Sequence, residues 1–140
     1  MAYWLYQMNS SYWSPALYRG EVWEGERTNW IVRRKVPKEN SPKPGDIMVL
    51  FYAPAGEPDP GIYGWSVVIS FDPDEKFYWV RFVPSPPSDY LKMNPVWDNG
   101  VKNIIRQIRG GVSRGTLWEI EDTLFKALRK KIAEHVYGVA

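Results

Sequence analysis

The sequence predicts an α+β fold in which a curled or partly closed sheet is flanked by helices. Most of the strand-like apolar and aromatic runs gather in the middle of the chain, and helical patterns lie before and after them. Such segregation of strands from helices is typical of α+β proteins. A small barrel covered by helices would also protect the aromatic strands, whose open edges would otherwise pair with other chains.

Length and composition narrow the class of protein. A chain of 140 residues is in the range of one compact domain, so we expect a single domain over residues 1–140. The absence of cysteine excludes disulfides and thiolate metal ligands and favours a reducing compartment. The first residues lack a secretory leader pattern, and no apolar run reaches the roughly 20 residues that span a bilayer. We therefore expect a soluble, cytoplasmic protein that does not bind a membrane.

Four segments have strand patterns. Residues 2–8 are aromatic and mostly apolar, and the continuous apolar run of residues 46–53 predicts a buried strand. Residues 62–71 and 76–83 flank the short stretch "DPDE" and predict a β-hairpin. These four segments would form the sheet.

The connections before and after these strands are rich in turn residues. Ser14 and Pro15 begin a short helix at most, which Gly20 would end. Residues 21–45 show no periodicity, so we expect them to be irregular. The proline-rich residues 84–95 are expected to stay outside any central strand.

Two helices are expected after the strands. The stretch "VKNIIRQI" (residues 101–108) has its apolar residues at helical spacing. Further on, "TLWE" predicts a capping box at the start of a C-terminal amphipathic helix, with Thr116 at the N-cap and Glu119 bonding back to it. The apolar stripe of that helix would consist of Leu117, Ile120, Leu124, Leu128, Ile132 and Val136.

Catalytic chemistry has few candidates. The single histidine, His135, lies near the end of the last helix, where a surface or capping position is the simpler explanation. The carboxylates Asp72, Asp74 and Glu75 crowd a turn and lack the longer ligand spacing of a calcium loop. No phosphate-binding glycine motif is present. The sequence therefore predicts a protein that is not an enzyme, with no catalytic residue, cofactor or metal.

The composition favours binding instead, because the chain has 8 Trp and 9 Tyr residues. Their faces stack on nucleobases with about 1–3 kcal/mol per base, and neighbouring Arg and Lys residues meet the phosphates. The net charge of +2 is too small to establish a nucleic-acid partner by itself. Trp23 stands between Glu21 and Glu24, where no periodicity would bury it, so we expect it to form a pocket wall. Trp30 is expected to pack inward.

Four motifs occur in order along the chain: "YWL" in the first strand, "WEGER" (residues 23–27), "KPGDIMVLFYA" (43–53) and "PGIYGWSVV" (60–68). They resemble the first strand, the W-x-G-x-R stretch, the P-G-D-x-x-x-x-Y strand entry and the G-I-x-G strand of one family. That family is the EVE domain of the PUA-like superfamily, related in fold to the YTH readers. The resemblance spans nearly the whole chain, including the C-terminal amphipathic helix.

The resemblance implies a PUA-like small twisted β-barrel flanked by helices. It also implies a pocket for a flat ring, typically a modified nucleobase flipped out of its strand. Trp23 would stack on the base, and Tyr52 would line the floor of the pocket. Gly25 and Gly64 would let the backbone approach closely, because glycine has no side chain. Arg27 would anchor the segment or meet a phosphate.

The chain departs from the family pattern in two places. "QMNS" (residues 7–10) stands where many EVE proteins have K-S-E-P, and Thr28 precedes the Asn that many have directly after W-x-G-x-R. Such polar groups would help to choose the ligand, because a buried donor or acceptor left unpaired is costly. The modification recognised, and whether DNA or RNA carries it, therefore stays open.

The first hypothesis is a non-enzymatic module that binds a modified base in DNA or RNA. Gln7 and Asn9 would contact the base edge, and Trp30, Tyr63 or Trp97 would supply a second pocket wall. The expected phosphate contacts are Arg33, Arg34, Arg106, Arg109 and Arg114.

Two other hypotheses stay open. A free nucleoside or another planar metabolite would fit the same pocket, and the modest net charge favours this alternative. Its affinity would depend little on salt, unlike that of a nucleic acid. A protein-interaction domain that uses the "PSPPSDY" loop ranks lowest. The oligomeric state also stays open.

Overall fold

The computed structural model describes residues 1–8, 29–32, 41–54, 60–72, 78–84, 95–110 and 117–137. For residues 8, 29–32, 71–72, 78–84 and 136–137, it describes the backbone alone. The short helix expected at residues 14–20 lies outside the described residues.

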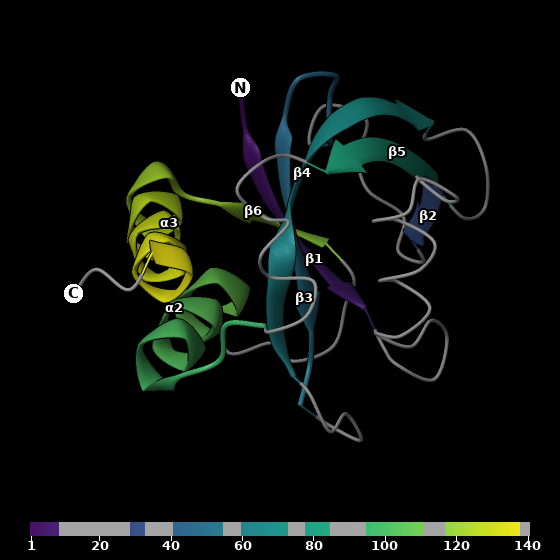
Figure 1. Ribbon diagram of the computed structural model, residues 1–140. Helices are drawn as coiled ribbons and strands as arrows, with labels where there is room; N and C mark the ends of the chain where they lie inside the picture. The colour runs from purple at the N-terminus through teal and green to yellow at the C-terminus, as the bar shows by residue number, and fades with distance from the viewer. Residues whose placement is uncertain are drawn as a thin grey trace.

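Six strands form one mixed sheet in the described part of the chain (Figure 1). They are β1 (Tyr3–Met8), β2 (Asn29–Val32), β3 (Ile47–Tyr52), β4 (Gly61–Asp72), β5 (Tyr78–Pro84) and β6 (Leu117–Ile120). Their order across the sheet is β2-β5-β4-β3-β1-β6. The neighbours β1 and β3 are parallel, and the other neighbouring pairs are antiparallel. The four predicted strands are therefore confirmed.

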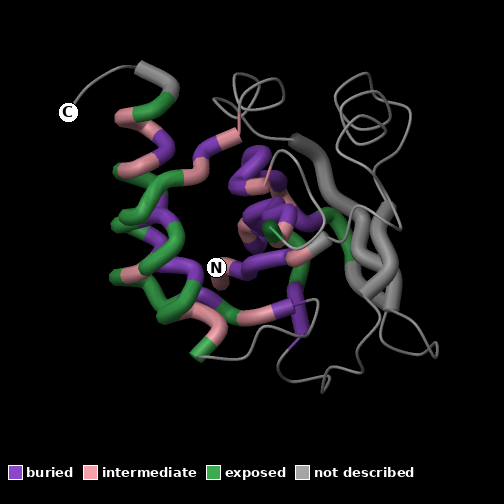
Figure 2. The backbone as a smooth tube through the Cα atoms, turned by 90° about the horizontal axis from the view of Figure 1, so that it is seen from below, coloured by how far each residue is buried: buried purple, intermediate pink, exposed green. Residues whose placement is uncertain are grey.

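Two helices pack against one face of this sheet, so the fold is α+β as predicted. α2 (Asn99–Arg109) and α3 (Asp122–Tyr137) lie together on the left in Figure 1, and Figure 2 shows their exposed residues turned away from the strands. The core between the helices and the sheet includes Leu5, Val49, Phe51, Trp65, Val101, Ile105, Phe125, Leu128 and Ile132. Among the described helices, none is long and apolar enough to cross a membrane.

The strands β1 and β3 are buried on both faces. Successive side chains of a strand point to opposite faces, and here the residues that alternate with the helix-facing ones are also buried. These residues are Trp4, Tyr6, Met48, Leu50 and Tyr52. Strands covered on both faces have continuous apolar sequences, which explains the uninterrupted run in β3.

Asp46, just before β3, fixes the start of β1. Its carboxylate accepts hydrogen bonds from the backbone N–H of Ala2 at 2.9 Å and from the indole Nε1 of Trp4 at 3.0 Å. A third bond comes from the backbone N–H of Lys43 at 2.9 Å. Burial works to raise the pKa of Asp46, but these hydrogen bonds outweigh it and lower the pKa overall. The carboxylate therefore stabilises this end of the sheet in its ionised form.

Helix α2 matches its sequence pattern closely. Asp98 caps its start, because the Asp98 carboxylate accepts the Val101 N–H at 2.8 Å. Gly110 ends it in the left-handed conformation, at φ 58°, with its N–H donated to the Gln107 carbonyl. The apolar positions Val101, Ile104 and Ile105 are buried, as the periodicity predicts.

The predicted capping box at the start of the last helix is wrong. Residues Leu117–Ile120 form β6, which pairs antiparallel with β1, and α3 begins only at Asp122. Leu117 and Ile120 are three residues apart, the spacing of one helical turn, but in β6 they lie on opposite faces of the sheet and both are buried. The segment forms a strand because it pairs with the edge of β1, which is distant in sequence. The N–H of Phe125 then donates to the Glu121 carbonyl at 2.9 Å, in the first turn of α3.

Residues 29–32 were expected to be irregular, and this prediction is also wrong, because they form β2 and pair with β5. β2 and β6 are the two edges of the described sheet, and no pairing among the described residues joins them. The described sheet is therefore open. β4 curves strongly in Figure 1 and changes partner along its length, from β3 in its first half to β5 in its second.

Candidate functional site

The carboxyl ends of β1 and β3 lie side by side because these two strands are parallel, with Gln7 opposite Phe51 and Met8 opposite Tyr52. The chain leaves β1 here and enters the segment that contains Trp23. Two of the predicted base-binding residues, Gln7 and Tyr52, therefore lie at the same end of the sheet. They face opposite sides of it, because Gln7 shares the side of Phe51 toward the helices, whereas Tyr52 alternates with Phe51.

Gln7 and Arg109 meet at this end of the sheet although they are 102 residues apart in sequence. Arg109, in the last turn of α2, donates a hydrogen bond from Nη1 to the Gln7 Oε1 at 2.9 Å. Its guanidinium also lies over the ring of Phe51, 5.6 Å from the ring centroid. Gln7, a predicted base contact, is thus hydrogen-bonded to Arg109, a predicted phosphate contact, and Arg109 lies over the fully buried ring of Phe51.

Arg109 is a half-buried cation with unused hydrogen-bonding capacity. Burial lowers the pKa of Arg109 from its ordinary value, because it disfavours the charged form. Its buried Nε has no hydrogen-bond partner among the described residues, and none of the described ion pairs includes this guanidinium. A desolvated cation without a counter-ion is costly, so an anionic or strongly accepting ligand would be favoured beside it.

Trp97 and Lys102 extend this cluster along α2. The half-buried ring of Trp97 lies 5.6 Å from that of Phe51, and the Lys102 ammonium lies 5.4 Å from the Trp97 ring. The rings of Trp97 and Phe51 therefore contact each other, and each also has a cation over it: Lys102 over Trp97 and Arg109 over Phe51. Sequence reasoning gave Lys102 no contact role, although it lies four residues before Arg106 and seven before Arg109, on one side of the helix.

Gly61 allows the segment before α2 to lie against β4. The backbones of Ile62 and Val96 exchange two hydrogen bonds of 3.0 Å. Gly61 has φ 135°, and a Cβ added there would lie 2.5 Å from the Val96 carbonyl oxygen. Only glycine fits such a position. The close approach of the two backbones that Gly61 allows places Trp97 near Phe51.

Tyr52 and Tyr63 form a buried aromatic pair, with ring centroids 5.0 Å apart. The pairing of β3 with β4 shifts by one residue between Leu50 and Phe51, which leaves Tyr63 as the extra residue of a β-bulge. Gly64 is the next residue and has φ 146°, a conformation that glycine supplies readily. The conformation of the bulge thus explains why a glycine occurs at position 64 without any ligand. The predicted contact of Tyr52 with a base stays a prediction.

The other predicted residues have less structural description. Arg106 is exposed in the last turn of α2. For Trp30 only the backbone, in β2, is described. The predicted residues outside the described ranges are Asn9, Trp23, Gly25, Arg27, Arg33, Arg34 and Arg114.

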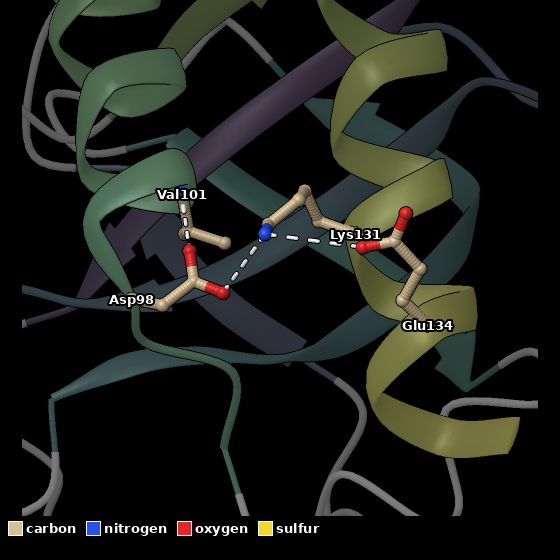
Figure 3. Close-up of polar contacts among 4 residues, drawn as sticks. All are labelled: Asp98, Val101, Lys131 and Glu134. Atoms are coloured by element: carbon tan, nitrogen blue, oxygen red, sulfur yellow. Dashed lines mark hydrogen bonds and ion pairs between the residues drawn. The ribbon is translucent and has the colours of Figure 1, made fainter. Parts of the chain in front are cut away.

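A second polar cluster joins α2 to α3 (Figure 3). The Asp98 carboxylate that caps α2 also lies 3.0 Å from the Lys131 ammonium of α3, which is 3.9 Å from Glu134. Partial burial works to raise the pKa of Asp98, but its bonds with Val101 and Lys131 outweigh it and lower the pKa overall. The acids and the cation in this cluster satisfy one another, so its role is structural. Within the described ranges, no group of three or more His, Asp or Glu side chains is arranged to hold a metal ion.

Comparison with known proteins shows the fold and nothing narrower. The sequence matches no protein-family profile and no curated protein. Two solved structures with a TM-score of 0.58 are a protein from Pseudomonas putida (13% identity, covering 93% of this chain and 99% of that one) and a hypothetical protein from Leishmania major (14% identity, 96% and 97%). A protein from Pseudomonas syringae has a TM-score of 0.53 at 15% identity and covers 92% of this chain and 98% of its own.

Proposed function

We propose that the protein is a non-enzymatic binding module that recognises a modified nucleobase in DNA or RNA. The base would enter a pocket at the carboxyl ends of β1 and β3, between these strands and the segment that contains Trp23. The observation that carries the proposal is the hydrogen bond of 2.9 Å between Arg109 and Gln7, held over the ring of Phe51. It provides a fixed polar group at the place where the chain enters that segment.

The proposal includes membership of the EVE family and closure of the sheet into a small twisted barrel. The four motifs support it because three of them fall on β1, β3 and β4, the central strands of the sheet. The curvature of β4, which pairs with β3 and then with β5, supports closure. Such a barrel would leave the pocket open at one end of the parallel strands.

The energetics explain why an aromatic wall needs a polar neighbour. Extruding a base from its stack costs a few kcal/mol. One ring, here Trp23, returns about 1–3 kcal/mol and only balances this cost. A hydrogen bond to a charged group adds about 1.5–3 kcal/mol, which is enough to make binding favourable. Arg109, positioned by Gln7, can supply it by donating to the phosphate beside the base.

A planar metabolite or free nucleoside is the second candidate, and the net charge of +2 favours it. It would use the same ring and the same guanidinium but no extended phosphate contact. Salt separates the two candidates, because each neutralised phosphate of a single strand adds about 0.7 to the slope of log affinity against log salt. A neutral metabolite would give a slope near zero.

The test is a titration, by tryptophan fluorescence, of short DNA and RNA strands that each carry one modified or unmodified base, at two salt concentrations. A preference for one modified base that weakens with salt is the expected result. Gln7→Ala should reduce that preference about tenfold, the equivalent of about 1.4 kcal/mol. Gln107→Ala, a matched change of an exposed glutamine on α2, should not. Equal affinity for every strand in the panel would overturn the proposal.

A further inference from the structure

Helix α2 has its cations on a single side. Lys102, Arg106 and Arg109 occur at spacings of four and three residues, and a helix turns about 100° per residue, so the three side chains fall within an arc of about 60°. Residues 99–109 contain no acidic residue. We call these three residues the α2 cation stripe.

The stripe is not neutralised by the described residues. The described ion pairs involve Lys126 and Lys131, both on α3, and none includes a member of the stripe. The two end members contact aromatic rings instead: Lys102 lies over Trp97, and Arg109 lies over Phe51. These contacts orient the cations without cancelling their charge, as a carboxylate would.

We propose that the α2 cation stripe binds the phosphodiester backbone of the single strand whose base enters the pocket. The inference rests on the proposed function for the identity of the strand. Arg109, bonded to Gln7, would hold the phosphate beside the pocket, and Arg106 and Lys102 would hold phosphates further along. The stripe extends about 10 Å along the axis at 1.5 Å per residue. That length corresponds to about three nucleotides of a stacked strand at 3.4 Å each.

One feature argues against an anionic membrane as the partner, and a second favours a single strand over a duplex. A membrane-surface helix inserts an apolar face into the bilayer. The apolar face of α2, with Val101, Ile104 and Ile105, is instead buried against the sheet and α3. An unpaired strand also offers its base to a pocket at a lower cost than a duplex does.

The test compares two matched double variants with the wild type. Lys102→Gln with Arg106→Gln removes one Lys and one Arg from the stripe but leaves Arg109 and its bond to Gln7 intact. Arg129→Gln with Lys130→Gln removes the same charges from exposed positions of α3, where no described ion pair is lost. Binding of a labelled, unmodified oligothymidylate of about 12 nucleotides is followed by fluorescence anisotropy over a range of salt concentrations.

The α2 double variant should weaken binding about 10- to 30-fold at 0.1 M salt and reduce the salt slope by about 1.4. The α3 double variant should keep the wild-type slope. Equal losses in both variants would overturn the inference, because net charge alone would then explain binding. So would wild-type binding to phosphatidylcholine–phosphatidylserine vesicles in preference to the strand. Stripe-dependent binding without preference for any modified base would uphold the stripe and overturn only the proposed base recognition.

Discussion

The helices α2 and α3 cover the same face of one sheet and are both rich in cations, yet they use them differently. On α3, Lys126 pairs with Asp122 at 2.9 Å, and Lys131 pairs with Asp98 at 3.0 Å. On α2, Lys102 and Arg109 contact aromatic rings, and the described residues include no acidic partner for either.

The difference shows that the number of basic residues on a helix does not predict its role. The cations of α3 that have carboxylate partners hold the helices together or stabilise a turn of the helix. The cations of α2 have no carboxylate partner among the described residues, and that of Arg109 is partly removed from water. A half-buried cation is costly unless a negative or strongly accepting group lies beside it, which is consistent with the proposed binding role of Arg109. The predictions below test that contrast.

The largest effect is expected at Phe51, the ring beneath Arg109. Phe51 is fully buried and contacts Trp97 as well, so Phe51→Ala should lower the free energy of unfolding by about 3–5 kcal/mol. Phe51→Leu retains most of the apolar volume and should cost about 1.5 kcal/mol or less. Urea denaturation measures both. The folded Leu variant should also bind strands more weakly, and wild-type affinity in it would show that the ring does not position Arg109.

The next effect is expected at Asp98, where the two helices meet. Asp98→Ala removes the N-cap of α2 and the pair with Lys131, and should cost about 1–2 kcal/mol. Asp98→Asn keeps a capping oxygen and loses only the ion pair, which is half exposed and therefore worth about 0.2–1 kcal/mol. Neither change should affect strand binding. A loss of affinity in the Asn variant would place Asp98 in the binding surface and break the contrast between the helices.

The sequence predicts the parts of this fold that depend on local patterns. β3 and α2 have apolar residues at strand and helix spacing, and both form where predicted. The sequence did not predict β6, because the spacing of Leu117 and Ile120 is that of a helical turn and the pairing with β1 is a contact distant in sequence. The sequence did not predict β2 for a related reason, since four residues are too few to show a clear strand periodicity among charged neighbours.

The site is only partly predictable for the same physical reason. Gln7 and Arg109 can each be identified by residue type and position, but their contact depends on how α2 packs on the sheet. The register of β1 against β3 puts Gln7 and Tyr52 on opposite faces, and a shift of one residue would put them together. No pattern within either strand determines that register.

A smaller effect is expected on the stability of the protein in acid. The pKa values of Asp46 and Asp98 are both lowered in the folded protein. A group with a lowered folded pKa contributes stability that is fully present above its unfolded pKa, about 3.9 for Asp, and is lost as the pH falls through the lower, folded pKa. Asp46→Asn and Asp98→Asn should each flatten this decline in urea denaturation. An unchanged pH profile in both variants would contradict it.

The smallest change in stability should come from Arg106→Gln, because two opposing effects cancel there. Arg106 lies near Lys102 and Arg109 on one side of α2, and like-charge pairs at these spacings cost about 0.2–0.5 kcal/mol each. A cation in the last turn of a helix gains about 0.3–1 kcal/mol from the helix dipole. The free energy of unfolding should therefore change by about 0.5 kcal/mol or less, while the salt slope of strand binding falls by about 0.7.

The matched variant on α3, Lys131→Gln, should have the opposite effects. It should lower the free energy of unfolding, because the ion pair with Asp98 is lost, and it should leave the salt slope of strand binding unchanged. If both variants change the same quantity, the two helices do not divide stability and binding between them.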